Sequence, residues 1–507
     1  MHDILHIFAY NEHGEPDEGD LLDSMYTADM EGEPFWSEFR VIGPGHLTCQ
    51  PGRSGPFQLH VFWEITSFGR VYAVADHCGQ GYLAGRDRKI TLNEELATSR
   101  VERTKRRLMA LEAAYSFAPA LRTRVEEADT LLSQASAQPS RERRMHLLQQ
   151  AHSKASWTLE EIEVAKARQD VQHLSDERRK SLRFGCNPFA FKRSKAFRDH
   201  FAELWDFGIV PFYREMVEPK EQHYDWQVMD ETLMWLESSH LAARGHPLFW
   251  GHEEVTPFWM KRLSHAALWE TVRRQVMETV SRYKGRIKLW DIMNEGHDWA
   301  PANVFGLQSQ EQLELTALIA HSVHEVDQEV VRILNNCTLW GEYVAWSEAK
   351  HPMSPYRYLY LLQEQGIPFE IIGLQLYYPD RDLADISLLL DKFAALDKPI
   401  HITELGTPSS ASTGKHIMHP IEEEWGAHHV RMPGRWHGPW NQKLQADWVE
   451  QFYLIALSKS SVEAISWWDF SDACCIYPFT GLLDHNDQPK EAFFRLQQLI
   501  SHVRQVQ

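Results

Sequence analysis

The stretch Ile287-Lys288-Leu289-Trp290-Asp291-Ile292-Met293-Asn294-Glu295-Gly296 decides how this chain is interpreted. It is a β-rich, largely apolar run that stops at Glu295, where a glycine begins a loop. A second run, Lys398-Pro399-Ile400-His401-Ile402-Thr403-Glu404, ends in the same way. In a (β/α)₈ barrel all strands end at one face, where catalytic groups gather. We therefore predict that Glu295 and Glu404 lie at the C-terminal face of such a barrel.

Residues 177–507 alternate between strand-like and helix-like segments, which is typical of an α/β chain folded as a (β/α)₈ TIM barrel. The predicted strands are 181–187, 208–213, 241–250, 287–294, 330–336, 370–377, 398–404 and 463–469. The predicted helices include 194–205, 225–238, 310–326, 442–458 and 491–500.

Two segments precede the predicted barrel. Residues 1–92 are rich in Gly, Pro and aromatic residues, and runs such as 57–63 alternate with a period of two, which predicts a small antiparallel β-sandwich. Residues 93–176 are rich in Glu, Arg, Ala and Leu at helical spacing, which predicts a hairpin of two long helices broken at 137–140. The sandwich is interpreted either as a carbohydrate-binding domain or as a packing domain.

Bulk properties limit the possible functions. The formal net charge of −19 argues against a nucleic-acid or anionic-membrane partner. No run of 18 apolar residues suggests a transmembrane helix, and the first residues lack the basic and apolar regions of a signal peptide. Six cysteines without a C-x-x-C pair indicate neither a zinc site nor a disulfide framework. We expect a cytoplasmic protein, or a secreted one if a signal has been removed.

Two carboxyl groups at strand ends suit glycoside hydrolysis. One carboxyl protonates the leaving oxygen, while the other attacks the anomeric carbon or activates water. The neighbouring strand ends also carry polar and aromatic side chains. In chain order these ends are Arg244-Gly245-His246-Pro247-Leu248-Phe249-Trp250, Trp290-Asp291-Ile292-Met293-Asn294-Glu295, Gly373-Leu374-Gln375-Leu376-Tyr377, Ile402-Thr403-Glu404-Leu405 and Ser466-Trp467-Trp468-Asp469.

This ordered set resembles glycoside hydrolase family 10, the endo-β-1,4-xylanase family, whose motifs are R-G-H-x-L-x-W, W-D-x-x-N-E, G-x-Q-x-H and I-T-E-L-D. The resemblance covers roughly residues 180–507. It implies that Glu295 is the acid/base, that Glu404 is the nucleophile and that Asn294 binds the sugar 2-hydroxyl. It further implies substrate-binding roles for His246, Trp250, Gln375, Tyr377 and Trp468, with Trp467 as the weaker alternative to Trp468.

Several positions depart from the family pattern. The family's strand-two Asn and Lys, which grip the glycone, are absent from Ile209-Val210-Pro211-Phe212-Tyr213-Arg214, and Tyr213 falls near the Lys position. Tyr377 stands where the family has His, and Gly406 stands where it has Asp. The chain after Trp250 is about two residues longer than in common bacterial members. These departures keep the predicted catalytic pair and alter recognition of the glycone.

A long segment, residues 407–441, follows the predicted strand of Glu404. It contains His416, His419, His428, His429 and His437 together with Trp425, Trp436 and Trp440. Long loops on enzymes are often functional. Because no H-E-x-x-H motif or cysteine partner accompanies these histidines, we interpret the segment as a lid or aglycone wall rather than a metal site.

The hypothesis from the sequence is a retaining glycosidase that cleaves β-1,4-xylosidic bonds by double displacement and needs no cofactor. Its expected partner is xylan or another β-linked oligosaccharide. One alternative is the same chemistry on a different β-linked glycan. Another is a carbohydrate-binding protein without activity. A phosphate-handling barrel is disfavoured because no Gly-rich phosphate loop is evident. The endo or exo mode and the oligomeric state remain open.

Overall fold

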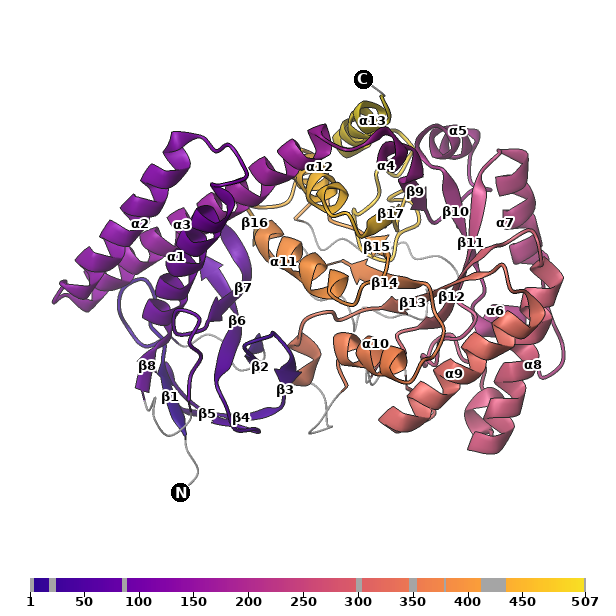
Figure 1. Cartoon of the computed structure of the whole chain (residues 1–507), viewed down its shortest axis with the longest axis horizontal. Helices are drawn as coiled ribbons and strands as arrows, with labels where there is room; N and C mark the ends of the chain where they lie inside the picture. The colour runs from indigo at the N-terminus through magenta and orange to yellow at the C-terminus, as the bar shows by residue number, and fades with distance from the viewer. Residues whose placement is uncertain are drawn as a thin grey trace.

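The computed structural model describes residues 4–17, 24–83, 89–297, 303–345, 353–377, 380–411 and 435–505. Figure 1 shows an N-terminal module of sheets and helices at the left and a barrel at the right. The long helix α3 (Arg141–Gln172) belongs to the module and runs across to the barrel. The two parts are also connected by side chains, as described below.

In the described part of the chain, eight parallel strands close into a barrel in the order β10-β11-β12-β13-β14-β15-β17-β9. Each of them coincides with one of the predicted strands, so the prediction of a (β/α)₈ barrel is confirmed. The strands are β9 (Arg183–Cys186), β10 (Phe207–Pro211), β11 (Ala242–His246), β12 (Leu289–Asn294), β13 (Val331–Asn336), β14 (Ile371–Leu376), β15 (Ile400–Leu405) and β17 (Val462–Trp467).

A helix follows each barrel strand and covers its outer face. These helices are α5 (Lys195–Leu204), α7 (Gln227–Ser238), α8 (His265–Tyr283), α9 (Ser309–Val326), α10 (Pro355–Glu364), α11 (Leu383–Ala394), α12 (Gln442–Ser458) and α13 (Glu491–Arg504). Short helices lie at α4 (Asp176–Ser181), α6 (Arg214–Val217), η2 (Met260–Arg262) and η4 (Glu342–Ala345). The five predicted barrel helices agree with α5, α7, α9, α12 and α13 to within a few residues.

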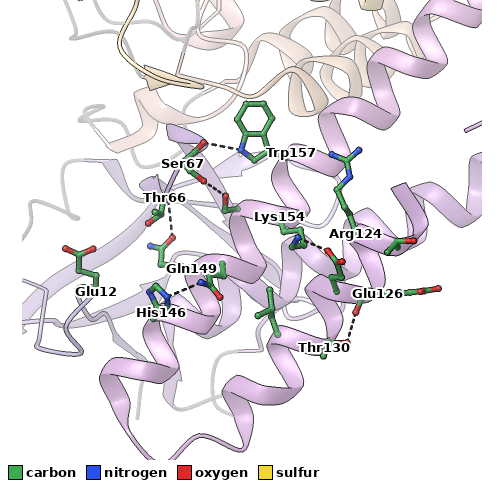
Figure 2. A pocket seen from close by; sticks show the side chains of 15 residues that line it. Glu12, Thr66, Ser67, Arg124, Glu126, Thr130, His146, Gln149, Lys154 and Trp157 are labelled. Carbon is green, nitrogen blue, oxygen red and sulfur yellow. Dashed lines mark hydrogen bonds and ion pairs between the residues drawn. The ribbon is translucent and has the colours of Figure 1, made fainter. Parts of the chain in front are cut away.

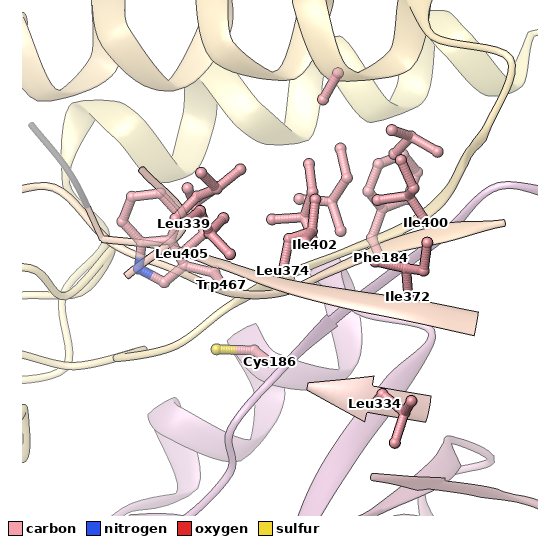
Figure 3. Packing of buried hydrophobic residues seen from close by; sticks show 14 of the residues in the cluster. Phe184, Cys186, Leu334, Leu339, Ile372, Leu374, Ile400, Ile402, Leu405 and Trp467 are labelled. Carbon is pink, nitrogen blue, oxygen red and sulfur yellow. The ribbon is translucent and has the colours of Figure 1, made fainter. Parts of the chain in front are cut away.

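The strands are apolar because both of their faces are covered, as parallel sheets require. Figure 3 shows Ile372, Leu374, Ile400 and Ile402 packed between the strands and the covering helices. Gly245 has a specific packing role, since a Cβ atom at this position would lie 2.2 Å from the ring of Trp290. The glycine between Arg244 and His246 therefore lets strands β11 and β12 pair around a buried indole.

The N-terminal module is built on two sheets, as predicted for a β-sandwich. In the described residues one sheet has the order β4-β5-β1-β8 and the other has the order β16-β7-β6-β2-β3. Apolar residues of both sheets share one core with the start of α1 (Leu92–Leu111). The strands are β1 (Leu5–Phe8), β2 (Tyr26–Asp29), β3 (Pro34–Phe35), β4 (Ser37–Gly43), β5 (His46–Pro51), β6 (Phe57–Ile65), β7 (Gly69–Ala75), β8 (Lys89–Thr91) and β16 (Arg435–Trp436).

Strand β16 comes from the far end of the chain. It follows the long segment after β15, yet it pairs antiparallel with β7, with Arg435 opposite Arg70 and Trp436 opposite Gly69. Neighbouring β6 and β7 form a regular antiparallel ladder. The N-terminal sheet therefore includes an edge strand that lies outside the predicted domain of residues 1–92.

Residues 93–176 are largely helical, as predicted, but the number of helices differs from the predicted pair. The described chain has three helices there, α1, α2 (Pro119–Ser136) and α3. The predicted break at 137–140 is present, and Ser140 caps α3 by accepting a hydrogen bond from the backbone N–H of Arg143. The missed break precedes Pro119, which occupies the first turn of α2, where its missing N–H costs nothing.

A groove of about 1100 Å³ lies between the turn at Thr66 and Ser67 and the helices α2 and α3 (Figure 2). Many of its polar side chains bond to one another, as Lys154 does to Glu127 at 2.7 Å and Ser67 does to Ser153 at 3.1 Å. None of the residues that line it belongs to the predicted catalytic site. No helix in the described ranges is both long and apolar enough to span a membrane.

Candidate active site

The two glutamates predicted as catalytic are both buried at the C-terminal ends of barrel strands. Glu295 directly follows β12, and Glu404 is the residue before the end of β15. Their exposed fractions are 7% and 5%. The intervening strands β13 and β14 end in Asn336 and Leu376 and contribute amide side chains between the two carboxyls.

The backbone of Glu295 adopts a left-handed conformation, with φ of 55°. Such a conformation is uncommon for a residue with a Cβ and is typical of functional sites. The N–H of Glu295 donates to the carbonyl of Asn335 at 2.7 Å, which holds the turn in place. Its carboxyl accepts hydrogen bonds from Trp250 Nε1 and Gln375 Nε2, each at 3.0 Å.

Glu404 is held by donors from two other strands. Asn335 Nδ2 donates to Oε1 at 2.8 Å, and the Tyr377 hydroxyl donates to Oε2 at 3.0 Å. His246 Nε2 lies 3.9 Å from Oε1. Donors aimed at a carboxylate stabilise its charged form.

A short chain of amides connects the two carboxyls. Asn294 Oδ1 accepts from Asn335 Nδ2 at 2.7 Å and from Gln375 Nε2 at 3.2 Å. Asn335 also reaches Glu404, and Gln375 also reaches Glu295. The backbone of Gln375 pairs with Glu404, but its described side-chain hydrogen bonds go to Asn294 and Glu295. Gln375 therefore lies beside the nucleophile candidate and orients the acid/base candidate.

The carboxyl pair shares a buried environment that opposes two negative charges. Burial, and after it the charge of Glu295, raises the pKa of Glu404 to about 8, while hydrogen bonding by Asn335 and the positive charge of Arg244 oppose this rise. Two interacting carboxyls titrate as a unit. At neutral pH the pair therefore keeps one proton, which general-acid catalysis requires.

His246 is fixed by a carboxylate behind it. Its Nδ1 lies 2.6 Å from Asp291 Oδ2, so Nδ1 carries the hydrogen and donates it. Burial lowers the pKa of His246, against the opposing effect of Asp291, which favours the neutral ring. Arg244 lies beside Asp291, with Nε 3.4 Å from Oδ2, and balances its charge. The Nε2 of neutral His246 is then an acceptor that faces the site.

Aromatic rings form a wall around His246. The ring centroid of Trp468 lies 5.3 Å from His246, whereas Trp467 points into the core and donates to the carbonyl of Thr480 at 3.1 Å. Trp468 is buried, and among the described residues no partner accepts a hydrogen bond from its Nε1. Tyr213 packs against the His246 ring at 5.8 Å, so an aromatic ring lines the site where the family pattern has a lysine.

Two departures from the family pattern fit each other. A Cβ atom at Gly406 would lie 3.3 Å from the ring of Tyr377, so a larger side chain there would crowd the tyrosine. Tyr477, from the loop after β17, packs against Tyr377 with a centroid distance of 5.0 Å. The tyrosine that replaces the family's histidine is thus accommodated by the glycine that replaces its aspartate.

The structure therefore brings together all eight residues predicted for the site, and it adds others. Four further side chains contact site residues, namely Asn335, Asp291, Tyr477 and Tyr213. Of these, only Tyr213 was singled out from the sequence. Of the long segment 407–441, residues 412–434 lie outside the described residues, and they include His416, His419, His428, His429 and Trp425. In the described ranges no group of three His, Cys, Asp or Glu side chains is arranged to bind a metal ion.

A family model matches the chain, and several known proteins are similar to it. Residues 213–499, more than half of the chain, match the model of glycosyl hydrolase family 10. The chain is 24% identical over 305 residues to endo-1,4-beta-xylanase B of Thermotoga neapolitana, covering 56% of this chain and 77% of that protein. It is 23% identical over 303 residues to the beta-1,4-xylanase of Dictyoglomus thermophilum, covering 56% and 78%. The crystal structure of xylanase 10B from Thermotoga maritima aligns with a TM-score of 0.49 and 19% identity, covering 64% of this chain and 97% of that one.

The barrel and its matched family model define the class as a glycoside hydrolase with a (β/α)₈ catalytic domain. The chain belongs to glycosyl hydrolase family 10, and it carries a sheet-rich N-terminal module with helices before the matched region.

Proposed function

We propose that the protein is a retaining β-glycosidase that cleaves β-1,4-xylosidic bonds in xylan or xylo-oligosaccharides. The observation that carries the proposal is the pair of buried glutamates at the ends of β12 and β15, joined by the amides of Asn294, Asn335 and Gln375. Both relatives named above are described as xylanases, which supports xylan as the substrate class.

In the first step the carboxylate of Glu404 attacks the anomeric carbon while Glu295 donates its proton to the glycosidic oxygen. The bond from the anomeric carbon to the leaving oxygen breaks as the glycosyl ester forms. In the second step Glu295 removes a proton from water, which attacks the anomeric carbon and releases Glu404. The proton that the pair shares must therefore lie on Glu295 before the attack, and the donors Asn335 and Tyr377 favour the charge that Glu404 then carries.

Substrate recognition is proposed to depend on the wall made of His246, Trp250 and Trp468, with Asn294 positioned for the 2-hydroxyl. This assignment predicts a carboxyl separation of about 5–5.5 Å, the spacing of retaining enzymes. Proton NMR of the first-formed sugar tests the stereochemistry, and a product of inverted configuration would refute the double displacement.

A second candidate is the same chemistry on a different β-linked glycan. The observation that favours it is Tyr213, whose ring lies against both His246 and Trp250 where the family has a lysine that grips the glycone. An aromatic ring in place of a cationic donor changes which hydroxyl groups the pocket satisfies. A pocket discriminates strongly only when its polar groups are left unpaired by the wrong sugar.

The experiment compares kcat/KM on aryl β-xylobiosides and aryl β-cellobiosides, followed by a panel of unmodified β-linked oligosaccharides. We expect the xylobioside to be the better substrate. Faster hydrolysis of the cellobioside, or of another β-glycan alone, would refute xylan and favour the second candidate. Binding of these glycans without any turnover would instead indicate a carbohydrate-binding protein.

Catalytic roles are tested with Glu404→Ala and Glu295→Ala. The first variant should be inactive even on substrates with excellent leaving groups, because no glycosyl ester forms. The second should lose activity mostly on poor leaving groups and should recover with azide, which replaces water as the nucleophile. Recovery of Glu404→Ala by azide with retained configuration would reverse the two roles.

A further inference from the structure

The N-terminal module binds four consecutive residues, 380–383, which are the end of the loop between β14 and α11 and the first residue of α11. The first of them lies three residues after Tyr377, the residue whose hydroxyl donates to Glu404. The four contacts are Tyr72 N–H to the Asp380 carbonyl (2.8 Å), Arg381 Nη2 to the Tyr26 hydroxyl (3.2 Å), Arg100 Nη2 to Asp382 Oδ2 (2.5 Å) and Leu383 N–H to Glu160 Oε1 (2.7 Å).

Arg381 is the centre of this contact. Its side chain is 1% exposed, and its guanidinium carbon lies 3.9 Å from the ring centroid of Tyr72 in the module. The same carbon lies 4.6 Å from the ring centroid of Trp340, which belongs to the barrel loop after β13. A guanidinium close to two aromatic rings gains cation–π attraction from each, and this attraction strengthens where water is excluded.

The connection after β15 is attached to the same module. Glu160 of α3 accepts from Trp436 Nε1 at 3.0 Å and lies 2.7 Å from His437 Nε2. Strand β16, which contains Trp436, extends the module's sheet. Residues that follow both Tyr377 and Glu404 in the chain are therefore anchored on the N-terminal module.

We propose that the N-terminal module is a positioning part of the active site, which acts through residues 380–383, with Arg381 at their centre, to hold the Tyr377 hydroxyl against Glu404. The inference rests on the proposed role of Glu404. It assigns the module a function other than glycan binding or spacing.

Only two residues separate Tyr377 from Asp380, so the anchored residues and Tyr377 are held close together by the chain itself. Three residues span at most about 10 Å even when fully extended, so Asp380 cannot move beyond that reach without moving Tyr377. The hydrogen bond from Tyr377 to Glu404 is 3.0 Å long, and an added shift of about 0.5 Å takes it outside the normal range. Loss of this donor destabilises the charged nucleophile and slows formation of the glycosyl ester.

The test compares Arg381→Ala, Tyr377→Phe and the double variant in the full-length protein. The first readout is the pH profile of kcat/KM on an aryl β-xyloside. The second is the carboxyl titration of Glu404, followed by NMR in protein labelled with ¹³C at the glutamate carboxyl and assigned with Glu404→Gln. The charged or titratable groups that face Glu404 are Glu295, Asp291, Arg244, His246, Cys337, Tyr377 and Tyr477.

We expect Tyr377→Phe to lower kcat/KM about ten- to a hundredfold, because a hydrogen bond to a charged group is lost. Tyr377→Phe and Arg381→Ala should both raise the pKa of Glu404. In the Tyr377→Phe background, Arg381→Ala should change kcat/KM and this pKa little further. Arg381→Lys should restore part of the effect. Independent, additive effects of Arg381→Ala and Tyr377→Phe, or an unmoved Glu404 titration, would overturn the proposal.

If Arg381→Ala does not fold, Asp382→Asn tests the attachment of the same residues, 380–383, to the module. This variant keeps the helix cap of α11 but removes the charge that pairs with Arg100. The control is Arg124→Ala, which removes an ion pair with Glu161 between α2 and α3 and should leave both readouts unchanged. If the wild type hydrolyses no glycoside, the proposed function fails, and the NMR titration still shows whether the module controls Glu404.

Discussion

Replacing Glu404 by Gln should remove a pH-dependent loss of stability. Burial and the charge of Glu295 raise the pKa of Glu404 from 4.5 to about 8. A carboxyl that holds its proton more tightly when folded stabilises the chain fully below pH 4.5, and this stabilisation is lost as the pH rises through 8. The rise corresponds to roughly 4–5 kcal/mol of unfolding free energy. Glutamine has nearly the same shape and is neutral at every pH, so the variant should lack this pH dependence.

The assay is urea unfolding of the wild type and Glu404→Gln at pH 5, 7 and 9. The difference between the two proteins at each pH is the quantity of interest, because titrations common to both cancel. The variant should gain relative stability between pH 5 and pH 9. In the Glu295→Gln background the gain should be smaller, since one of the two causes is removed. A difference that stays constant with pH would refute the reasoning.

Three further outcomes are expected. Asn335→Ala removes donors to Glu404 and Asn294 and should lower kcat/KM by about one to two orders of magnitude; an effect on KM alone would contradict a role at the nucleophile. Trp250→Phe removes the N–H that donates to Glu295, so hydrolysis of substrates with poor leaving groups should slow more than that of activated ones, and equal slowing would count against it. The kcat/KM of the wild type should decline above about pH 8 as the carboxyl pair loses its shared proton, and a profile that stays flat to pH 10 would exclude this assignment.

Much of the barrel was predictable because its strands are buried on both faces. An apolar run such as that before Asn294 is easily distinguished from its surroundings, and its end marks the catalytic face. The extra helix break was missed although Pro119 marks it, because the apolar spacing on either side of residues 112–118 is similar. Strand β16 was not predictable, since two residues that pair with Arg70 and Gly69 carry no periodic pattern.

The catalytic pair was predictable from motifs, whereas its supporting residues were not. Asn335 stands at the end of an ordinary strand, and only the folded barrel aims its amide at Glu404. Asp291 lies inside a quoted motif, but its bond to His246 links two strands and has no local signal. Arg381 resembles any surface arginine until the module encloses it.

The contacts of Glu160 and strand β16 join distant parts of the chain, which has a consequence for the order in which the chain folds during synthesis. The carboxylate of Glu160 has partners 223 and 276 positions later in the chain, and β7 finds its β16 partner at Arg435. During synthesis from the N-terminus, the carboxylate of Glu160 therefore lacks these partners until the later residues have been made. The edge of the module's sheet at β7 stays unpaired for the same time. Open edges are the sites at which chains pair wrongly. The module that appears first during translation is thus completed only after seven of the eight barrel strands have been made.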